Sequence, residues 1–200
     1  GYDCRPYRLP ELTDVVVFEI DHPATQARKR ARLPKLVSQI AGNVTFVPTD
    51  FNERSLADAI KGTGFRFGRR NFVILEGVTE CLSPEVVDAT FRFVVDVSAS
   101  GSELVFTYLD TGLIRGTKTF AGGRRTLALN RLRGGAYTFG LDPATLRDHL
   151  AERNLELLED IAGEGCQEKF FKPLGRKLFA NEYQRTALAR VRTESAEHAE

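Results

Sequence analysis

The sequence predicts an α/β fold with a parallel, doubly wound sheet. Short apolar runs alternate with segments that carry helix signals over most of the 200 residues. This alternation is typical of parallel strands joined by right-handed crossovers. Acidic residues also follow three successive predicted strands, and such sheets bind ligands beyond the carboxyl ends of their strands. We therefore expect an α/β domain that binds a ligand at this edge of its sheet.

The composition suits one globular domain. Apolar residues make up 42% of the chain and charged residues 28%, which allows a sizeable core. With 28 basic and 27 acidic residues, the net charge of +1 gives no electrostatic reason to expect a nucleic-acid partner. Cys4, Cys81 and Cys166 lie far apart without a CxxC pair. We therefore expect no disulfide framework, no metal site and a reducing, cytoplasmic setting.

The chain is expected to be a monomer without a membrane partner. No run reaches the roughly eighteen apolar residues that a membrane span requires. The chain contains no methionine and begins at Gly1. We therefore expect the true N-terminus, and any earlier strand, to lie upstream of the printed sequence.

Six segments have the apolar, β-branched character of strands. The first, from Val15 to Ile20, is nearly all apolar, as expected of a strand that is buried on both faces of a sheet. The other five are residues 44–47, 71–75, 103–109, 155–161 and 183–191.

Helix signals separate these strands. Pro23 suits the first turn of a helix that extends to Ile40 and is divided at Pro34. Ser83-Pro84-Glu85 combines a cap, a proline and an acid at the start of a helix that extends to about residue 98. Two more helices are expected at residues 56–61, capped by Ser55, and at residues 143–153.

One long segment lacks a clear period. Residues 110–140 hold seven glycines and many basic residues. A segment of this length is usually a functional insertion. We expect a lid at about 110–141 within a single domain of residues 1–193, followed by a flexible polar tail at 194–200.

The first candidate site combines Gly1 with the acids Glu19 and Asp21. A glycine turn followed about twenty residues later by carboxylates at a strand end has the spacing of a nucleotide-type cofactor site. A carboxylate there can accept both hydroxyl protons of a ribose. The alternative is that one of these acids caps the helix that begins near Pro23.

Two later strand ends supply further candidates. Asp50 can hydrogen-bond an adenine amino group while Phe51 packs on the ring, although an ordinary Asx turn would explain Asp50 equally well. Glu76 ends an apolar strand and is expected to be buried or half-buried, so it needs a partner. Gly77 would let a ligand approach the backbone there.

Five strings of the sequence resemble the leucine carboxyl methyltransferase family, in particular its bacterial branch of S-adenosylmethionine-dependent O-methyltransferases. The resemblance is expected to cover nearly the whole chain. The strings are GYDCRPYRL (1–9), VFEIDHPATQ (17–26), FVPTDFN (46–52), LEGVTECLSPE (75–85) and YTFGLDP (137–143). Two positions depart from the family pattern, because the family usually has threonine or serine at Cys4 and tyrosine at Cys81.

The resemblance implies a Rossmann-like class I methyltransferase sheet with an antiparallel last strand, and S-adenosyl-L-methionine as cofactor. It implies that Gly1 ends the glycine motif, that Asp21 and not Glu19 is the acid of the second strand, that Asp50 and Phe51 flank the adenine, and that Glu76 ends the fourth strand. It also implies that the first, central strand is missing from this chain, which would then fold poorly and bind the cofactor weakly.

The function expected from the resemblance is O-methylation of a carboxylate or hydroxyl of a small molecule. A carboxylate acceptor needs no base, whereas a phenol or alcohol would need one, for which His22 and Tyr137 are candidates. The alternatives are a nicotinamide-dependent dehydrogenase and a catalytically silent cofactor-binding scaffold. The insertion has basic residues that would suit an acidic acceptor, although solvated basic loops are common. They are Arg115, Lys118, Arg124, Arg125, Arg131 and Arg133.

Overall fold

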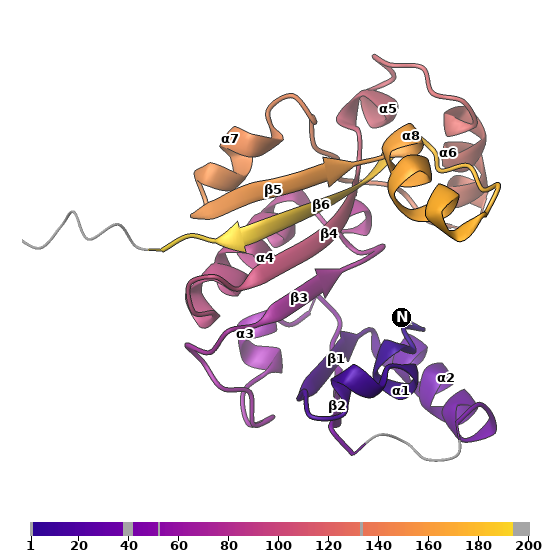
Figure 1. Cartoon of the computed structure of the whole chain (residues 1–200). Coiled ribbons are helices and arrows are strands. Elements are labelled where there is room, and N and C mark those ends of the chain that lie inside the picture. The colour runs from indigo at the N-terminus through magenta and orange to yellow at the C-terminus, as the bar shows by residue number, and fades with distance from the viewer. Residues whose placement is uncertain (1, 38–41, 52, 133, 194–200) are drawn as a thin grey trace, which may run out of the picture. The chain divides into compact units, whose positions relative to one another are not determined.

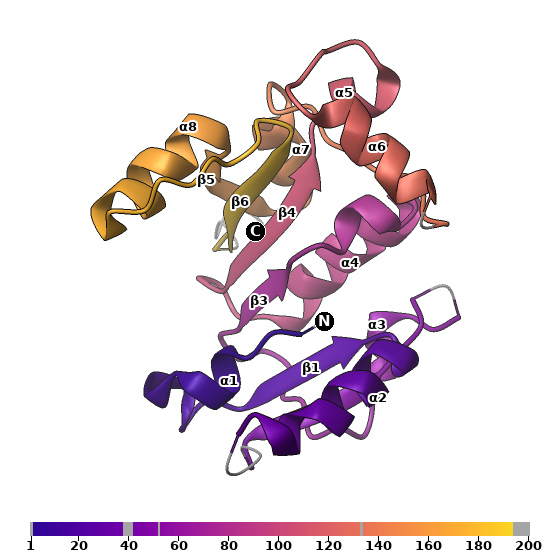
Figure 2. The ribbon, with the colours of Figure 1, turned by 90° about the vertical axis from the view of Figure 1, so that its right-hand side faces the viewer.

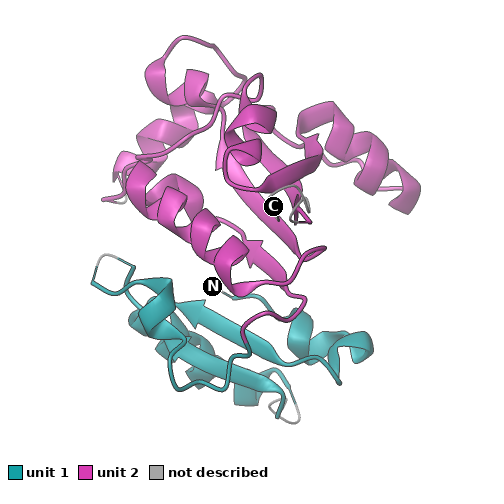
Figure 3. Cartoon of the chain, turned by 90° about the vertical axis from the view of Figure 1, so that its left-hand side faces the viewer, with its two compact units in different colours: residues 1–66 teal, residues 67–200 magenta. Residues whose placement is uncertain are grey.

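The computed structural model describes residues 2–37, 42–51, 53–132 and 134–193 (Figure 1). Gly1, and the tail predicted at 194–200, lie outside the described residues. The chain forms two compact units, residues 1–66 and residues 67–200, which Figure 3 shows in different colours.

Unit 1 contains a two-stranded parallel sheet with helices before, between and after its strands. Strand β1 (Val17–Asp21) pairs with β2 (Val44–Pro48), so that Asp21 lies opposite Pro48 at the carboxyl ends of both strands. Helix α2 (Pro23–Arg32) lies between the two strands in sequence. Helices α1 (Arg5–Arg8) and α3 (Leu56–Ala59) are the other helices of this unit, with single 3-10 turns at Pro10–Leu12 and Leu33–Lys35.

Local signals explain where these helices begin and end. Pro23 occupies the first turn of α2, as the sequence predicted. The α-helix ends at Arg32 before the 3-10 turn that contains Pro34, and residues 36–37 do not continue it toward Ile40 as expected; residues 38–40 lie outside the described residues. Ser55 caps α3 by accepting a hydrogen bond of 3.1 Å from the Asp58 amide. The cap of α2 is His22, whose Nδ1 accepts a hydrogen bond of 3.2 Å from the Ala24 amide.

Unit 2 contains a four-stranded mixed sheet in the order β3-β4-β6-β5 (Figure 2). Strand β3 (Phe72–Leu75) is parallel to β4 (Glu103–Leu109), whereas β6 (Gln184–Val191) is antiparallel to both β4 and β5 (Leu155–Ile161). The helices of unit 2 are α4 (Pro84–Val97), α5 (Thr111–Arg115), α6 (Gly123–Leu132), α7 (Leu146–Ala151) and α8 (Gly163–Cys166). Short 3-10 or π turns lie at Thr79–Cys81, Gln167–Phe171 and Lys172–Leu174.

The core of unit 2 forms where α4 and α7 cover the sheet. The rings of Phe91 on α4 and Phe106 on β4 are both fully buried, with centroids 4.9 Å apart. Leu146 and Leu150 of α7 belong to the same cluster. Each helix buries one face against the sheet, which holds the helix in place. The same packing holds the ends of β3 and β4, from which the loops of the site emerge.

The α/β class with a mixed sheet and an antiparallel last strand is confirmed. The parallel direction expected from alternation alone is wrong for β6. Because β5 and β6 are antiparallel neighbours, α8 and the turns that follow it connect the two strands at one end of the sheet and do not cross it. The described strands form two sheets, one in each unit. Residues 110–141 are also more regular than expected, because they contain α5 and α6.

Candidate functional site

The carboxyl ends of β1 and β2 bring together Asp21, His22 and Asp50. The amide of Thr49 donates a hydrogen bond of 2.8 Å to the Asp21 carbonyl, which continues the ladder to the point where both strands end. Asp21 Oδ1 accepts a hydrogen bond of 2.7 Å from the His22 amide. Because His22 Nδ1 is an acceptor, the ring proton of a neutral His22 lies on Nε2. That nitrogen lies 3.5 Å from Asp50 Oδ2.

These contacts place two carboxylates at one end of the unit 1 sheet. Asp21, Asp50 and Phe51 are all partly exposed, as acids and an aromatic ring that meet a ligand must be. The Asp50 carbonyl accepts hydrogen bonds from the amides of Glu53 and Arg54, at 3.1 and 2.9 Å, so a backbone turn holds this loop. His22, considered as a possible base, is instead a helix cap that lies beside Asp50.

Glu19 lies apart from this pair, in a buried ion pair. Its carboxylate contacts Lys29 Nζ and accepts a hydrogen bond of 3.0 Å from the Tyr7 hydroxyl. The side chains of Lys29 and Glu19 are only 3% and 14% exposed. Burial, and then the charge of Glu19, raise the pKa of Tyr7. The contacts therefore give Glu19 a structural role, whereas Asp21 reaches the strand end.

Glu76 belongs to unit 2 and is exposed, so our expectation of a buried carboxylate was wrong. The physical reason is that β3 is an edge strand of its sheet, and even its Phe72 is 60% exposed. Gly77 has a φ of 68°, a conformation that favours glycine, and its amide donates a hydrogen bond of 2.8 Å to Thr107 Oγ1. Whether Glu76 contacts a cofactor stays a prediction.

Sequence reasoning missed a second acid near this strand end. Glu80 is only 5% exposed, and its carboxylate lies 3.5 Å from Thr79 Oγ1. Burial raises the pKa of Glu80 above its ordinary value of 4.5. An acid between Thr79 and Cys81 in a single 3-10 turn carries no periodic signal of burial, so only the three-dimensional packing identifies this residue.

The raised pKa of Glu80 predicts a pH-dependent stability. Because the folded-state pKa exceeds the unfolded one, the folded protein binds more protons, and the free energy of unfolding falls as pH rises from 4.5 through the folded-state pKa. Glu80→Gln is expected to remove this decline and to stabilise the protein at pH above that range. Denaturant titrations at several pH values measure how the free energy of unfolding of the parent and of Glu80→Gln changes with pH.

Glu85→Gln is the matched control for this experiment. A hydrogen bond from Ser83 lowers the pKa of the exposed Glu85 carboxyl. Its stabilising contribution is therefore present above the unfolded pKa and lost as pH falls, which is the opposite sign. An unchanged pH slope in Glu80→Gln would contradict the role assigned to burial.

The segment that follows β4 is anchored by Asp110. This carboxylate is 4% exposed, accepts a hydrogen bond of 2.7 Å from the Gly112 amide and pairs with Lys118 Nζ at 2.9 Å. An added Cβ at Gly112 would lie 2.6 Å from the Lys118 side chain and 2.9 Å from Asp110 Oδ1, so a larger residue there would displace this ion pair. Tyr183 closes the base of the segment, with its hydroxyl 2.7 Å from Thr126 Oγ1.

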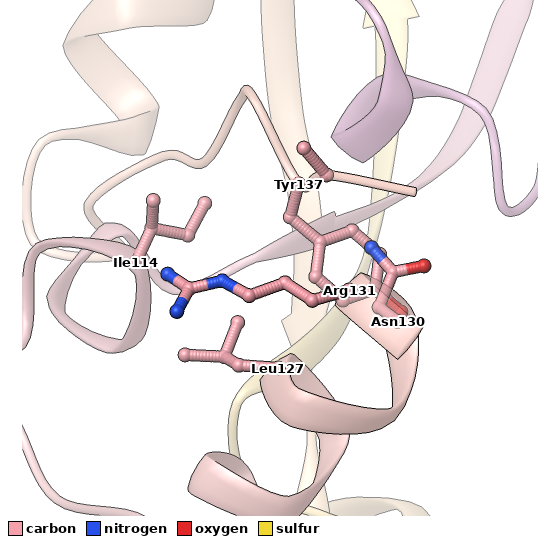
Figure 4. A pocket seen from close by; sticks show the side chains of 6 residues that line it. Ile114, Leu127, Asn130, Arg131 and Tyr137 are labelled. Atoms are coloured by element: carbon pink, nitrogen blue, oxygen red, sulfur yellow. The ribbon is translucent and has the colours of Figure 1, made fainter. Parts of the chain in front are cut away.

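A small pocket lies inside this segment (Figure 4). Its volume is about 80 Å³, room for about five water-sized groups. In Figure 4 the Arg131 guanidinium lies between the side chains of Ile114 and Leu127. The Arg131 guanidinium forms no hydrogen bond or ion pair with any residue that the structure describes. The lining residues are Ile114, Leu127, Asn130, Arg131, Ala136 and Tyr137.

Hydrogen bonds connect the wall of this pocket to the loop after Glu76. The residue after Tyr137 is Thr138, whose amide donates to the Glu80 carbonyl at 2.9 Å and whose hydroxyl donates to the Leu82 carbonyl at 2.7 Å. The pocket therefore lies near the carboxyl ends of β3 and β4, the edge at which α/β sheets bind their ligands.

Comparison with known proteins supports the resemblance found in the motifs. Residues 1–95 match the family model of leucine carboxyl methyltransferase, a shorter stretch than we expected. A candidate S-adenosyl-L-methionine-dependent methyltransferase of Mycolicibacterium gilvum is 38% identical over 109 residues, which are 54% of this chain and 35% of that protein. One of Bacillus subtilis is 34% identical over 114 residues, 56% and 37% of the two chains. The matched region spans about a third of these curated relatives.

Solved structures extend the likeness of the fold to most of the chain. A candidate methyltransferase of Thermobifida fusca gives a TM-score of 0.60 at 17% identity and covers 90% of this chain and 64% of its own. The fold is that of class I methyltransferases, and these matches give no support to the dehydrogenase alternative. The first 95 residues of the chain are therefore similar to the leucine carboxyl methyltransferase family, as their motifs indicated.

Proposed function

We propose that the protein is an S-adenosylmethionine-dependent O-methyltransferase that acts on a carboxylate or hydroxyl of a small molecule. The observation that carries this proposal is the pair of partly exposed acids, Asp21 and Asp50, at adjacent ends of parallel strands in the region that matches the family. The names of the relatives, which refer to S-adenosyl-L-methionine, support the choice of cofactor.

In this proposal the acids of unit 1 bind the nucleoside part of the cofactor. Asp21 accepts hydrogen bonds from the ribose hydroxyls, and Asp50 and Phe51 contact the adenine. The His22 contacts hold the backbone after Asp21 and the side chain of Asp50 in fixed positions. Fixed carboxylates lose little side-chain entropy when they bind a ligand.

Methyl transfer mainly requires that the acceptor atom, the methyl carbon and the sulfur are aligned and that water is excluded. The cofactor supplies a methyl group that is already activated on a sulfonium sulfur. An acceptor carboxylate oxygen forms the new O–C bond while the C–S bond breaks. The electron pair of the broken C–S bond stays on sulfur. No proton moves in this step, so a carboxylate acceptor requires no base from this chain.

The Arg131 pocket is proposed to bind the acceptor. Ile114 and Leu127 offer apolar walls, and the guanidinium between them offers a charge to an acid. A charge-assisted hydrogen bond of this kind contributes about 1.5 to 3 kcal/mol. Arg131→Gln is therefore expected to raise KM for an acidic acceptor by about tenfold to a hundredfold. Arg124→Gln is the control, because it removes another exposed arginine of α6 that does not line the pocket.

The test is incubation of the protein with methyl-labelled cofactor and a panel of small acids and phenols, with the products identified by mass spectrometry. Transfer to oxygen supports the proposal, whereas transfer only to nitrogen or carbon contradicts it. Binding of S-adenosylhomocysteine is measured in parallel by calorimetry. A folded protein that neither transfers methyl groups nor binds S-adenosylhomocysteine would be the silent scaffold.

A further inference from the structure

Residues 169–179, here called the basic-apolar loop, expose large apolar side chains. Phe179 is 88% exposed and Leu174 69%, and Leu178 and Phe170 are exposed by about half. All residues from 172 to 179 are exposed. Figure 2 shows the helical segment that begins at α8 projecting away from the sheet, on the side opposite α4. Exposed apolar groups that gather in this way mark an interaction surface.

The conformation of the basic-apolar loop is defined by its own hydrogen bonds. Gly175 has a φ of 65° and ends the 3-10 turn, with its amide donating 2.9 Å to the Lys172 carbonyl. The amide of Arg176 donates 2.9 Å to the Phe171 carbonyl. The chain therefore reverses at Gly175, which presents Leu174 before the turn and Leu178 with Phe179 after it.

The charges of the loop are all positive. Residues 169–179 contain four basic and no acidic residues. Lys169 and Lys172 pair with Glu159 and Glu168. Arg176 and Lys177 form no ion pair with any residue in the part of the chain that the structure describes. Two uncompensated cations thus lie next to the most exposed apolar side chains.

We propose that the basic-apolar loop binds the surface of an anionic lipid membrane. Aromatic and leucine side chains enter the boundary between headgroups and acyl chains, while neighbouring Lys and Arg attract anionic headgroups. A protein partner fits less well, because protein interfaces are depleted in lysine, and three of the four cations here are lysines. A side chain that is 88% exposed also lies in no groove.

This inference revises the expectation of no membrane partner, which rested on spanning segments alone. Within the described residues, every helix falls short of the length and apolarity needed to cross a membrane. Surface binding needs no such helix.

The experiment is sedimentation of the protein with vesicles of phosphatidylcholine, with and without phosphatidylglycerol, at low and high salt. We expect salt-sensitive binding only to vesicles that contain phosphatidylglycerol. Arg176→Gln with Lys177→Gln is expected to weaken binding about 25-fold, roughly fivefold for each cation. Phe179→Ser is expected to weaken it by about tenfold or more.

Matched variants separate this surface from general charge and apolarity. Arg124→Gln with Arg125→Gln removes the same charge from α6, and Leu132→Ser removes an apolar side chain that is 83% exposed. Both should bind as the parent does, and circular dichroism checks that every variant is folded. Failure of the folded parent to bind, equal binding to pure phosphatidylcholine, or equal losses in the controls would overturn the proposal. So would a dimer that Phe179→Ser dissociates, because a second copy would then cover the loop.

Discussion

Glu19→Gln is expected to lower the free energy of unfolding of unit 1 by about 3 kcal/mol, because it leaves a buried ammonium without its counter-charge. The Lys29 side chain is 3% exposed, and its ammonium contacts the Glu19 carboxylate and the Asp3 carbonyl. Hydrogen exchange of the β1 and α2 amides reports the loss directly. Glu19→Leu combined with Lys29→Met should recover most of the stability, because it removes both charges.

Asp21→Asn is the contrasting variant, two residues along the same strand. It keeps the acceptor oxygen for the His22 amide, so we expect little change in stability. Affinity for S-adenosylhomocysteine should fall by about tenfold or more, because a charged acceptor is lost. If Glu19→Gln bound S-adenosylhomocysteine more weakly while unit 1 stayed folded, Glu19 and not Asp21 would be the cofactor-binding acid.

Asp160→Ala is expected to destabilise unit 2 by about 3 kcal/mol. Asp160 on β5 pairs with Arg185 on β6 at 2.9 Å, and it accepts a hydrogen bond of 2.9 Å from the Tyr108 hydroxyl of β4. The side chains of Arg185 and Asp160 are 21% and 12% exposed. Burial, and then the charge of Asp160, raise the pKa of Tyr108. Removing the acid leaves the Arg185 guanidinium without its counter-charge. The Tyr108 hydroxyl loses its acceptor and keeps only the hydrogen bond of 3.1 Å that it accepts from Arg185 Nε.

Tyr108→Phe is the control for this group, because it removes the hydroxyl and keeps the ring and the ion pair. It should lower the free energy of unfolding by about 1 to 2 kcal/mol, because the hydroxyl donates one hydrogen bond to Asp160 and accepts one from Arg185, and each contributes about 1 kcal/mol. Urea denaturation followed by far-ultraviolet circular dichroism measures both variants. Equal losses in the two variants would show that the hydroxyl, and not the ion pair, stabilises the centre of the sheet.

The sequence predicts most of the strands because apolar and β-branched residues run through them. Residues 103–109 and 155–161 are strands as expected, and the other four strands differ by one or two residues at an end. Ser55 and Ser83 were recognised as caps because capping depends on neighbours in sequence alone.

The features that were not predicted depend on distant contacts. Nothing near Glu19 in sequence indicates its ion pair, because Lys29 reaches it from α2. Helices α5 and α6 were missed because the glycines between them interrupt the period, and the Asp110 and Tyr183 contacts that hold the segment come from strand ends. The exposure of Glu76 follows from the edge position of β3, which the order of elements along the chain does not reveal.

The antiparallel strand β6 also has a consequence for how the protein is made. It is the last of the described strands in sequence, yet it lies between β4 and β5 and supplies a neighbour to both. During synthesis, domains form from the N-terminal side as the chain emerges. The facing edges of β4 and β5 must therefore remain unpaired until residues 184–191 leave the ribosome. During this time the two edges can mispair with other strands.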